Sequence, residues 1–439
     1  MRLFDNQITS VNKNEIQDII ENHAHDLSAG LQPLMDRIGD ARIVMLGEAS
    51  HGTHEYYIWR AFITKKLIEE KGFNLIGVEG DWPDCYRINR YVRNYEESGE
   101  TAPEVLKKFH RWPTWMWANW EIASLMEWLQ NYNKNNNNRV GFYGLDVYSL
   151  WESLDAVMDY LRKNDPEALA AAQKAYQCFE PFNREGQDYA LSTRFAPETC
   201  EQEVLDLLSE IRNRVPLYDS DPEAPFNTEQ NALVAANAER YYRAMIKGGP
   251  ESWNIRDRHM TETLEKLLNF NGPESKAVLW EHNTHIGDAR ATDMHRGGMV
   301  NVGQLVREKW GKSSTVFVGF GSYEGSVIAG DSWGAEMQEM HVPKARENSW
   351  EDLLHRSKPE NKIIISDDIK EYKQMQKRLN HRAIGVVYDP GMEHYGNYVP
   401  SMIPERYDAF VFIDKTKALH AINTRKEKML TPETYPFGV

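Results

Sequence analysis

The chain is poor in cysteine and contains no long apolar run. Its three cysteines, Cys85, Cys178 and Cys200, are scattered through 439 residues without a paired spacing. This pattern predicts no disulfide framework and a reducing compartment. No apolar stretch approaches the ~20 residues that a membrane-spanning helix needs. Residues 1–7 lack the basic start and apolar core of a signal peptide, so we expect a cytoplasmic protein with no membrane partner.

The chain also lacks an excess of basic residues. It carries 51 lysines and arginines against 66 aspartates and glutamates, a formal net charge of −15. Such a surface repels phosphate backbones, so the sequence argues against nucleic acid as a partner. A composition of 41% hydrophobic and 27% charged residues fits a folded protein of one large domain with insertions, or of two to three domains.

Several catalytic and cofactor-binding motifs are absent. The sequence has no Gly-x-Ser-x-Gly elbow, which disfavours a standard serine hydrolase. It has no Walker A loop and no Gly-x-Gly-x-x-Gly after a predicted strand, so no nucleotide cofactor is indicated. We therefore expect no cofactor, and histidine-driven activation of water is the simplest chemistry that the sequence offers.

The most informative segment is Gly-Glu-Ala-Ser-His-Gly-Thr at residues 47–53. It follows a predicted buried strand, residues 43–46, and precedes a predicted amphipathic helix, residues 54–71. Glu48 and His51 therefore lie at the carboxyl end of a strand, where open α/β sheets bind ligands. A carboxylate within hydrogen-bonding reach of His51 would orient the ring and raise its basicity, as a general base requires.

Ionisable or polar groups follow three further predicted strands, at residues 74–78, 140–145 and 277–280. In that order they are Glu79 and Asp81; Asp146, Tyr148 and Ser149; and Glu281, His282, His285 and Asp288. The carboxyl ends of parallel strands meet at one edge of a sheet, so we expect these groups to converge with Glu48 and His51. The alternative for each lone histidine is a structural or exposed position.

The order of elements predicts the fold class. Further strands are expected at residues 315–320, 383–388 and 410–413, and helices over 15–35, much of 83–132 and 151–268, with turns near 216–225. This alternation predicts an α/β protein: a central, mostly parallel sheet flanked by helices, with an inserted helical lobe and a small additional α/β portion. We assign the core to residues 36–150 and 270–414 with a helical insertion near 83–135, the lobe to 151–269, and peripheral segments to 1–35 and 415–439.

Other candidate site residues have more than one interpretation. Arg60 is either a solvated helix charge or an inward-facing group that pairs with Glu79 or Asp81 or stabilises an oxyanion. His282 and His285 are polar residues near a helix start, metal ligands, or groups that polarise a substrate carbonyl. Residues 393–396 form a weaker candidate for the rim of the pocket.

A group of tryptophans lies in the predicted helical insertion. Its members are Trp112, Trp115, Trp117, Trp120 and Trp128. They indicate either core packing between helices or a wall for a bulky apolar substrate.

The segment at residues 47–53, with Glu55 and Arg60 after it, resembles the signature of the erythromycin esterase family. Later segments resemble further blocks of that family: Val-Glu-Gly-Asp at 78–81, Gly-Leu-Asp at 144–146, Trp-Glu-His-Asn-Thr-His at 280–285, and residues 405–413. These matches run in order from about residue 40 to residue 414. Some relatives carry the label succinoglycan biosynthesis protein.

The resemblance implies a central α/β sheet with a helical lobe, and hydrolysis of a macrolide lactone ester, which confers resistance to the antibiotic. It implies that His51 is the general base for water, that Glu48 supports it, and that His282 and His285 line the same cleft. Glu281 stands where we expect a small residue. Its carboxylate is expected to raise the pKa values of the two histidines or to bind a metal.

Three functions follow from these observations. The first is a metal-independent esterase with His51 as base, Glu48 as its partner, and Arg60, His282 or His285 at the oxyanion. Its small-molecule substrate would contact Glu79, Asp81, Asp146, Tyr148 and Trp117.

The second function is a metallohydrolase, in keeping with a more distant resemblance of the fold to Tiki-like metalloproteases. Its divalent ion would be held by Glu48, His51, Glu79, His282 and His285. The third is a non-catalytic binding protein for a polyketide or carbohydrate, whose acids would bond ligand hydroxyls. No heptad pattern indicates a coiled coil.

Overall fold

The computed structural model describes residues 13–182, 184, 186–194, 199–213 and 221–422. In this part of the chain nine strands form one sheet: β1 His25–Asp26, β2 Ile43–Leu46, β3 Leu75–Asp81, β4 Gly141–Asp146, β5 Ala277–Trp280, β6 Thr315–Ala329, β7 Gln338–Val342, β8 Lys362–Ile365 and β11 Ala409–Thr416. Their order is β1-β8-β11-β6-β2-β5-β3-β4, with β7 paired to β6. Residues 1–7 and residues 216–220, the first half of the expected turn region, lie outside the described residues.

The sheet is mostly parallel. The strands from β11 through β6, β2, β5 and β3 to β4 run parallel, whereas β8, β1 and β7 pair antiparallel. A separate antiparallel pair consists of β9, Leu379–Arg382, and β10, Tyr398–Ser401. The predicted α/β class, with its central sheet, helical lobe and small additional portion, is confirmed.

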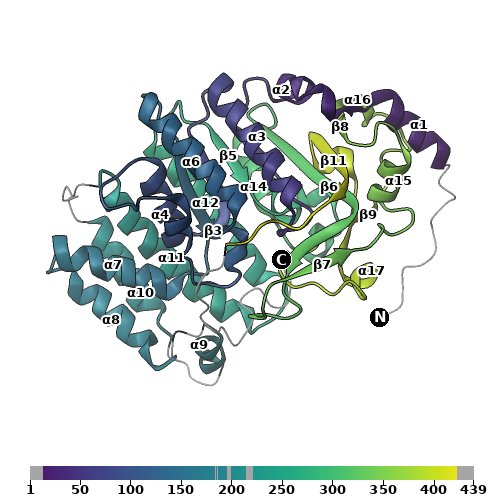
Figure 1. Ribbon diagram of the computed structural model, residues 1–439. Helices are drawn as coiled ribbons and strands as arrows, with labels where there is room; N and C mark the ends of the chain where they lie inside the picture. Colours follow the sequence, from purple (N-terminus) through teal and green to yellow (C-terminus); the bar gives the residue numbers. More distant parts are fainter. Residues whose placement is uncertain (1–12, 183, 185, 195–198, 214–220, 423–439) are drawn as a thin grey trace.

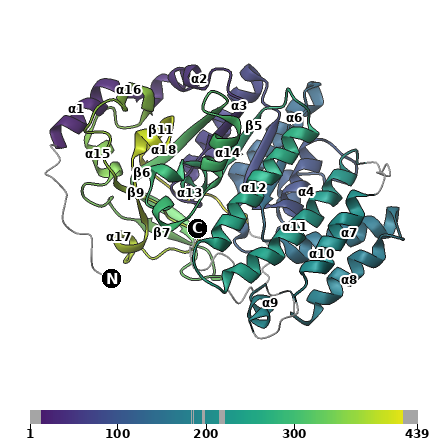
Figure 2. The same cartoon turned by 180° about the vertical axis from the view of Figure 1, so that it is seen from behind.

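Helices cover both faces of the sheet (Figures 1 and 2). On one face lie α3, His54–Lys71, and α6, Trp120–Asn135; on the other lie α12, Glu251–Phe270, and α14, Val302–Trp310. Val44 and Leu46 of β2 pack with α3 and α6, while its alternate residues pack with α12 and α14. Because both faces of β2 are buried, its sequence is a continuous apolar run rather than an alternating one.

The remaining helices connect these layers. They are α1 Lys13–His23, α2 Gln32–Ile38, α4 Trp82–Val92, α5 Ala102–Leu106, α13 Asn283–Ile286, α15 Trp350–Arg356, α16 Ser366–Ile369, α17 Glu393–Gly396 and α18 Ile403–Arg406. The lobe that follows β4 contains α7 Leu150–Asn164, α8 Leu169–Phe179, α9 Gly186–Thr193, α10 Glu201–Arg212 and α11 Ala224–Met245. It has an apolar core of its own and lies at the β4 end of the sheet (Figure 1).

The predicted helix over residues 15–35 is wrong in its second half. The chain leaves α1 at His23, forms β1 and then a short 3₁₀ turn at Leu27–Ala29 before α2 begins. The Asp26 carboxylate accepts from the backbone N–H of Ser28, and Gly30 has a φ of 112°, which a helix cannot contain. This local hydrogen bond and backbone conformation interrupt the helix that the apolar periodicity predicts.

The predicted strand at residues 383–388 is also wrong. Strand β9 ends at Arg382, and the following residues make only isolated bridges, from Ile384 to Ser50 and from Val387 to Gly330. Ile384 and Tyr388 are nevertheless buried in a small apolar cluster. A buried connecting segment thus shows the same apolar composition as a strand.

The expectation of no disulfide is wrong as well. Cys178 in α8 and Cys200, at the start of α10, are bonded to one another across a sequence separation of 22 residues, while Cys85 is free and buried. Helix packing in the lobe brings the two sulfurs together, which the spacing alone does not show. The cysteine pattern therefore no longer supports a reducing compartment. Among the described helices, none has both the length and the apolar composition needed to cross a bilayer.

Candidate active site

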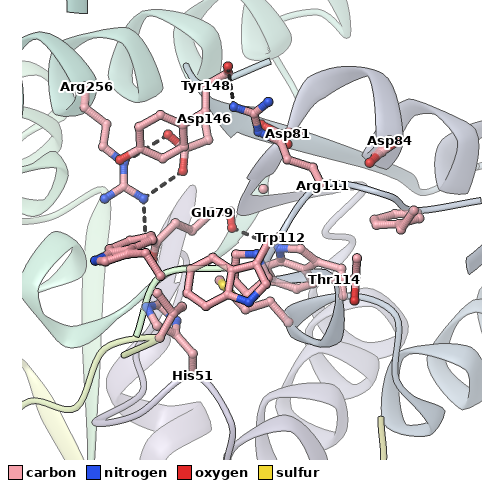
Figure 3. A pocket seen from close by; sticks show the side chains of 17 residues that line it. His51, Glu79, Asp81, Asp84, Arg111, Trp112, Thr114, Asp146, Tyr148 and Arg256 are labelled. Atoms are coloured by element: carbon pink, nitrogen blue, oxygen red, sulfur yellow. Dashed lines mark hydrogen bonds and ion pairs between the residues drawn. The ribbon is translucent and has the colours of Figure 1, made fainter. Parts of the chain in front are cut away.

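A pocket opens at the carboxyl ends of the parallel strands (Figure 3). It encloses about 650 Å³, part of it open to solvent. Its lining residues are His51, Glu79, Gly80, Asp81, Asp84, Phe109, Arg111, Trp112, Pro113, Thr114, Met116, Trp117, Asp146, Tyr148, Arg256, Trp333 and Val386. The loop after β2, the ends of β3 and β4, the insertion before α6 and the helix α12 therefore all contribute to one site.

The structure brings together most of the residues singled out from the sequence. Seven of them line the pocket: His51, Glu79, Asp81, Asp146, Tyr148, Trp112 and Trp117. Four others lie behind this wall, each at most 1% exposed: Glu48, Arg60, His282 and His285. Asp288 pairs with Arg290, and Tyr395 of the expected rim is 85% exposed, so neither belongs to the pocket lining.

His51 and Glu48 form a hydrogen-bonded pair at the end of β2. The distance from His51 Nδ1 to Glu48 Oε1 is 2.9 Å, and each side chain is 1% exposed. The bond assigns the proton on this ring to Nδ1, so Nε2 is the nitrogen that remains for the pocket. Helix α3 begins directly after the loop and ends at Gly72, as predicted, and this short connection holds the loop against the sheet.

Arg60 faces inward, so the interpretation as a solvated helix charge is wrong, and its partner is neither Glu79 nor Asp81 but Glu48. It is fully buried and donates from Nη2 to Glu48 Oε2 at 2.6 Å. Its guanidinium carbon lies 4.5 Å from the centroid of the Tyr57 ring and 4.7 Å from that of the Trp280 ring. Arg60 thus holds Glu48 from behind, on the inner face of α3, and does not reach the pocket.

Arg256 on α12 joins the acids at the ends of β3 and β4. It donates from Nε and Nη2 to the two oxygens of Asp146 at 3.0 and 2.7 Å, and from Nη2 to Glu79 Oε1 at 2.6 Å. Figure 3 shows this cluster above His51. Burial lowers the pKa of Arg256, but Asp146, Tyr148 and Glu79 raise it, with a net shift well above the usual value. The pocket therefore contains a permanent positive charge.

Glu79 is an ionised carboxylate within this cluster. Burial raises its pKa, but His285, Arg256 and His51 lower it, and the net pKa lies below the usual value. Its second oxygen, Oε2, accepts the backbone N–H of His282 at 2.8 Å. Glu79 therefore links the strand end of β3 to the segment after β5.

His285 serves as a support behind the cluster. Its Nδ1 lies 2.9 Å from Asp257 Oδ1, and its Nε2 lies 3.0 Å from Arg256 Nη1 and 3.4 Å from Glu79 Oε1. The ring stacks on Trp253 with a centroid distance of 4.5 Å. With both nitrogens engaged, His285 positions Arg256 and Glu79 and has no contact surface in the pocket lining.

The expectation that Glu281 raises the pKa values of the neighbouring histidines is wrong for His282. Burial raises the pKa of Glu281 well above its usual value, with Glu79 adding to the effect, so this acid is neutral. Burial, followed by the proximity of His51, lowers the pKa of His282 well below its usual value. The rings of His282 and His51 are 4.9 Å apart, so a neutral imidazole lies against the candidate base.

The alternative metal ligands do not form a compact ligand set. In the described part of the chain, a group of three candidate ligands has its ligand atoms within 4.8 Å of one another, and it consists of His54, Glu121 and His420. Neither His54 nor His420 is among the five residues proposed from the sequence. Glu48, behind the pocket wall, already accepts a bond from Arg60, and Glu79, in the lining, accepts one from Arg256.

The tryptophans divide between the two interpretations. Trp112 and Trp117 line the pocket together with Trp333, and the rings of Trp112 and Trp333 are 4.9 Å apart. Trp117 Nε1 donates to the Glu79 carbonyl at 2.9 Å, which fixes the ring beside the site. Trp115 is buried in the core, whereas Trp120 is 54% exposed.

Charged residues occupy the opposite part of the pocket. Arg111 lies 3.1 Å from Asp81 Oδ2 and donates to the Tyr148 carbonyl at 2.7 Å. Burial raises the pKa of Asp84 to about 6, although Arg87 lowers it. The negative charge of Asp84 therefore develops as the pH rises through about 6.

Sequence reasoning missed the contributions of α12, chiefly Arg256 and Asp257. Both lie on α12 between the buried residues Trp253 and Met260, so they occupy the apolar face of that helix. Two charged residues at core positions of an amphipathic helix were the available signal, since buried charges need partners.

Comparison with known proteins adds the evidence of common descent. Residues 68–416 match the family model described as erythromycin esterase. Erythromycin esterase type II of Escherichia coli is 25% identical over 382 residues, which cover 80% of this chain and 86% of that protein.

Two solved structures share the fold. A succinoglycan biosynthesis protein has a TM-score of 0.75 at 20% identity and covers 95% of this chain and all of its own. A mutant of the erythromycin esterase EreC in its open conformation has a TM-score of 0.64 at 16% identity and covers 89% of this chain and 94% of its own.

Proposed function

The chain belongs to the erythromycin esterase family, and from this premise we propose that it is a hydrolase that cleaves a carboxylic ester or lactone with water activated by His51. One observation carries the proposal: His51 lines the pocket while its Nδ1 is bonded to Glu48. The pair is thereby oriented for proton transfer at Nε2. The hydrolase chemistry also agrees with the names of the relatives.

In the proposed reaction His51 Nε2 takes a proton from water as the water oxygen attacks the ester carbonyl. A C–O bond forms, and the carbonyl electron pair moves to the oxygen, which gives a tetrahedral oxyanion. Collapse of this intermediate breaks the bond to the alcohol oxygen, which takes the proton from His51. Glu48, fixed by Arg60, stabilises the imidazolium that forms in between.

Arg256 is the residue best placed to stabilise the oxyanion. It lines the pocket, whereas Arg60, His282 and His285 do not. A guanidinium held by Asp146 and Glu79 cannot turn away, so little reorganisation is needed as negative charge develops. The catalytic residues of this proposal are thus His51 and Arg256, with Glu48, Arg60 and His285 as positioning residues.

The pocket favours a bulky, amphipathic substrate. Trp112, Trp117 and Trp333 offer flat apolar surface, while Asp81 and Asp84 offer acceptors for hydroxyl or cationic groups. The macrolide lactones indicated by the names of the relatives are therefore the first candidates. Simple lactones and aryl esters are the second.

The test is a screen of macrolides, simple lactones and aryl esters by mass spectrometry, with the wild type beside His51→Ala. We expect a product heavier by one water, formed by the wild type and lost in the variant. His341→Ala is a matched control, because His341 is exposed on β7 and is not among the residues that line the pocket. Turnover by a folded His51→Ala variant would contradict the proposed base, and tight binding without turnover would indicate a binding protein.

A further inference from the structure

A segment near the end of the described chain, residues 417–422, connects two parts of the pocket wall. Its backbone bonds the loop after β2, through Leu419 N–H to the Gly52 carbonyl at 3.0 Å and His54 N–H to the Lys417 carbonyl at 2.8 Å. It also bonds the start of α6, through Trp120 N–H to the His420 carbonyl at 2.9 Å. Residues 417–422 therefore join the loop that carries His51 to the insertion that carries Trp117.

Two histidines and a glutamate meet where this segment crosses. His54 begins α3, Glu121 lies in the first turn of α6, and His420 lies on the crossing segment. His54 Nδ1 is 2.6 Å and His420 Nδ1 is 2.8 Å from the same oxygen, Glu121 Oε1. The glutamate side chain is 3% exposed, whereas the imidazoles are 29% and 65% exposed.

We propose that His54, Glu121 and His420 bind a divalent transition-metal ion of the Zn²⁺ class, at a site separate from the pocket. Their candidate ligand atoms all lie within 4.8 Å of one another. Two imidazole nitrogens and one carboxylate oxygen are a ligand set suited to Zn²⁺, Co²⁺, Ni²⁺ or Cu²⁺. The exposed side of the cluster leaves a fourth position for water.

The distances define the movement that binding requires. Metal–ligand bonds of about 2.0–2.1 Å in tetrahedral geometry separate two ligand atoms by about 3.3 Å. The N–O distances of 2.6 Å at His54 and 2.8 Å at His420 must therefore widen by about 0.7 Å and about 0.5 Å. His420 makes this movement without disturbing the core, because its side chain is largely exposed.

The proton balance is simple. In the hydrogen-bonded state each Nδ1 atom carries its own proton and donates it to Glu121. On binding, each neutral ring moves this proton to Nε2, and Nδ1 donates its electron pair to the metal. Glu121 Oε1 accepts from both rings, so the carboxylate oxygen already faces the two nitrogens that would bind the cation.

The consequence is a clamp on the pocket wall. An ion held by α3, α6 and the crossing segment would fix residues 417–422 against the loop that carries His51. Because the ion binds the folded state, it would raise the melting temperature. A hydrogen-bonded cluster without a metal would produce no such response.

The experiment uses the full chain without an affinity tag, treated with chelator and then dialysed. Zn²⁺ titration by calorimetry should show one ion per chain, and Co²⁺ should give the visible absorption of a tetrahedral site. His54→Ala and His420→Ala should each weaken binding at least about ten-fold, since a lost ligand costs at least as much as a lost supporting residue. His341→Ala, which removes an exposed imidazole on β7 that is not part of this cluster, should bind as the wild type does.

His420→Asn separates the metal site from a hydrogen-bonded clamp. The asparagine amide can still donate to Glu121 but is a poor ligand for Zn²⁺, so we expect normal folding with weakened Zn²⁺ binding. Zn²⁺ should raise the melting temperature of the wild type by about 2 °C or more and leave that of His420→Asn unchanged. The proposal would be overturned if the wild type showed no saturable Zn²⁺ binding. It would also be overturned if His54→Ala, His420→Ala and His420→Asn bound Zn²⁺ as tightly as the wild type.

Discussion

Two buried histidine–glutamate pairs of almost the same design lie in this molecule. In the first, at the end of β2, His51 Nδ1 bonds Glu48 Oε1 at 2.9 Å. In the second, Nδ1 of His381 on β9 bonds Oε1 of Glu351 on α15 at 2.5 Å. Both rings are 1% exposed, and both glutamates accept a further donor: Arg60 at Glu48 and the backbone N–H of Arg382 at Glu351.

The pairs differ at the second ring nitrogen. Nε2 of His381 lies 3.2 Å from the Tyr407 hydroxyl and 3.3 Å from Asn283 Nδ2, so its ring is enclosed by protein. His51 instead lines the pocket. A histidine–carboxylate pair thus does not make a catalytic site by itself, because a general base also needs a free ring nitrogen that faces a cavity. The following predictions test this distinction.

The largest expected effect is the loss of activity in His51→Ala. Removal of a general base lowers kcat/KM by about 10²–10⁴-fold, while the melting temperature should change little because the ring borders a cavity. The measurement is steady-state kinetics on the substrate found by the screen, with thermal unfolding in parallel. His381→Ala is the matched variant, and a similar loss of kcat in its folded fraction would remove the distinction between the pairs.

Arg256→Lys should lower kcat by about 10²–10³-fold, as expected when one preorganised donor to an oxyanion is lost. Lysine keeps the charge but cannot bond Asp146 and Glu79 with the same planar fork. Arg382→Lys is the control, because that guanidinium bonds Glu393 and backbone carbonyls away from the pocket. Unchanged kcat in Arg256→Lys would remove Arg256 from the mechanism.

Glu351→Gln should lower the free energy of unfolding by about 2–4 kcal/mol. Burial raises the pKa of Glu351, but His381 and Arg382 lower it further, so the side chain is a carboxylate. The variant replaces this buried, hydrogen-bonded carboxylate with a neutral amide. Chemical denaturation measures this loss. Activity per folded molecule should stay normal, in contrast to Glu48→Gln, where kcat should fall.

Glu281→Gln should instead stabilise the protein, and more so at high pH. The folded-state pKa of Glu281 is raised above its usual 4.5, so the folded chain keeps a proton that the unfolded chain loses above that pH. The contribution of Glu281 to the free energy of unfolding therefore declines as the pH rises, by at most about 1.4 kcal/mol per pH unit. Unfolding at pH 5 and pH 8 should show a larger gain for the variant at pH 8. An equal gain at both would contradict a neutral Glu281.

Local sequence patterns predicted the sheet edge well. The bounds of β2, β5 and α3 agree with the predicted residues, because an apolar run, a glycine stop and a following amphipathic period are all local signals. Parallel pairing then placed Glu79, Asp146 and His51 together, since connectivity fixes which strand ends share an edge.

Other features depended on contacts between distant segments. Arg256 reaches Asp146 across 110 positions in the chain, and the partner of Arg60 is Glu48 rather than an acid of the next strand. The Cys178–Cys200 bond depends on how α8 packs near α10. No short-range pattern contains this information, because packing rather than periodicity selects the partner.

The sequence by itself determined the layered α/β architecture and the delivery of acids and histidines to one edge, because burial and chain connectivity act locally and in order. Only the tertiary structure decided which histidine nitrogen faces a cavity and which is enclosed. That choice depends on the few ångströms between the ring and the next packed side chain. Tyr407 and Asn283 occupy this space beside His381, and the pocket occupies it beside His51.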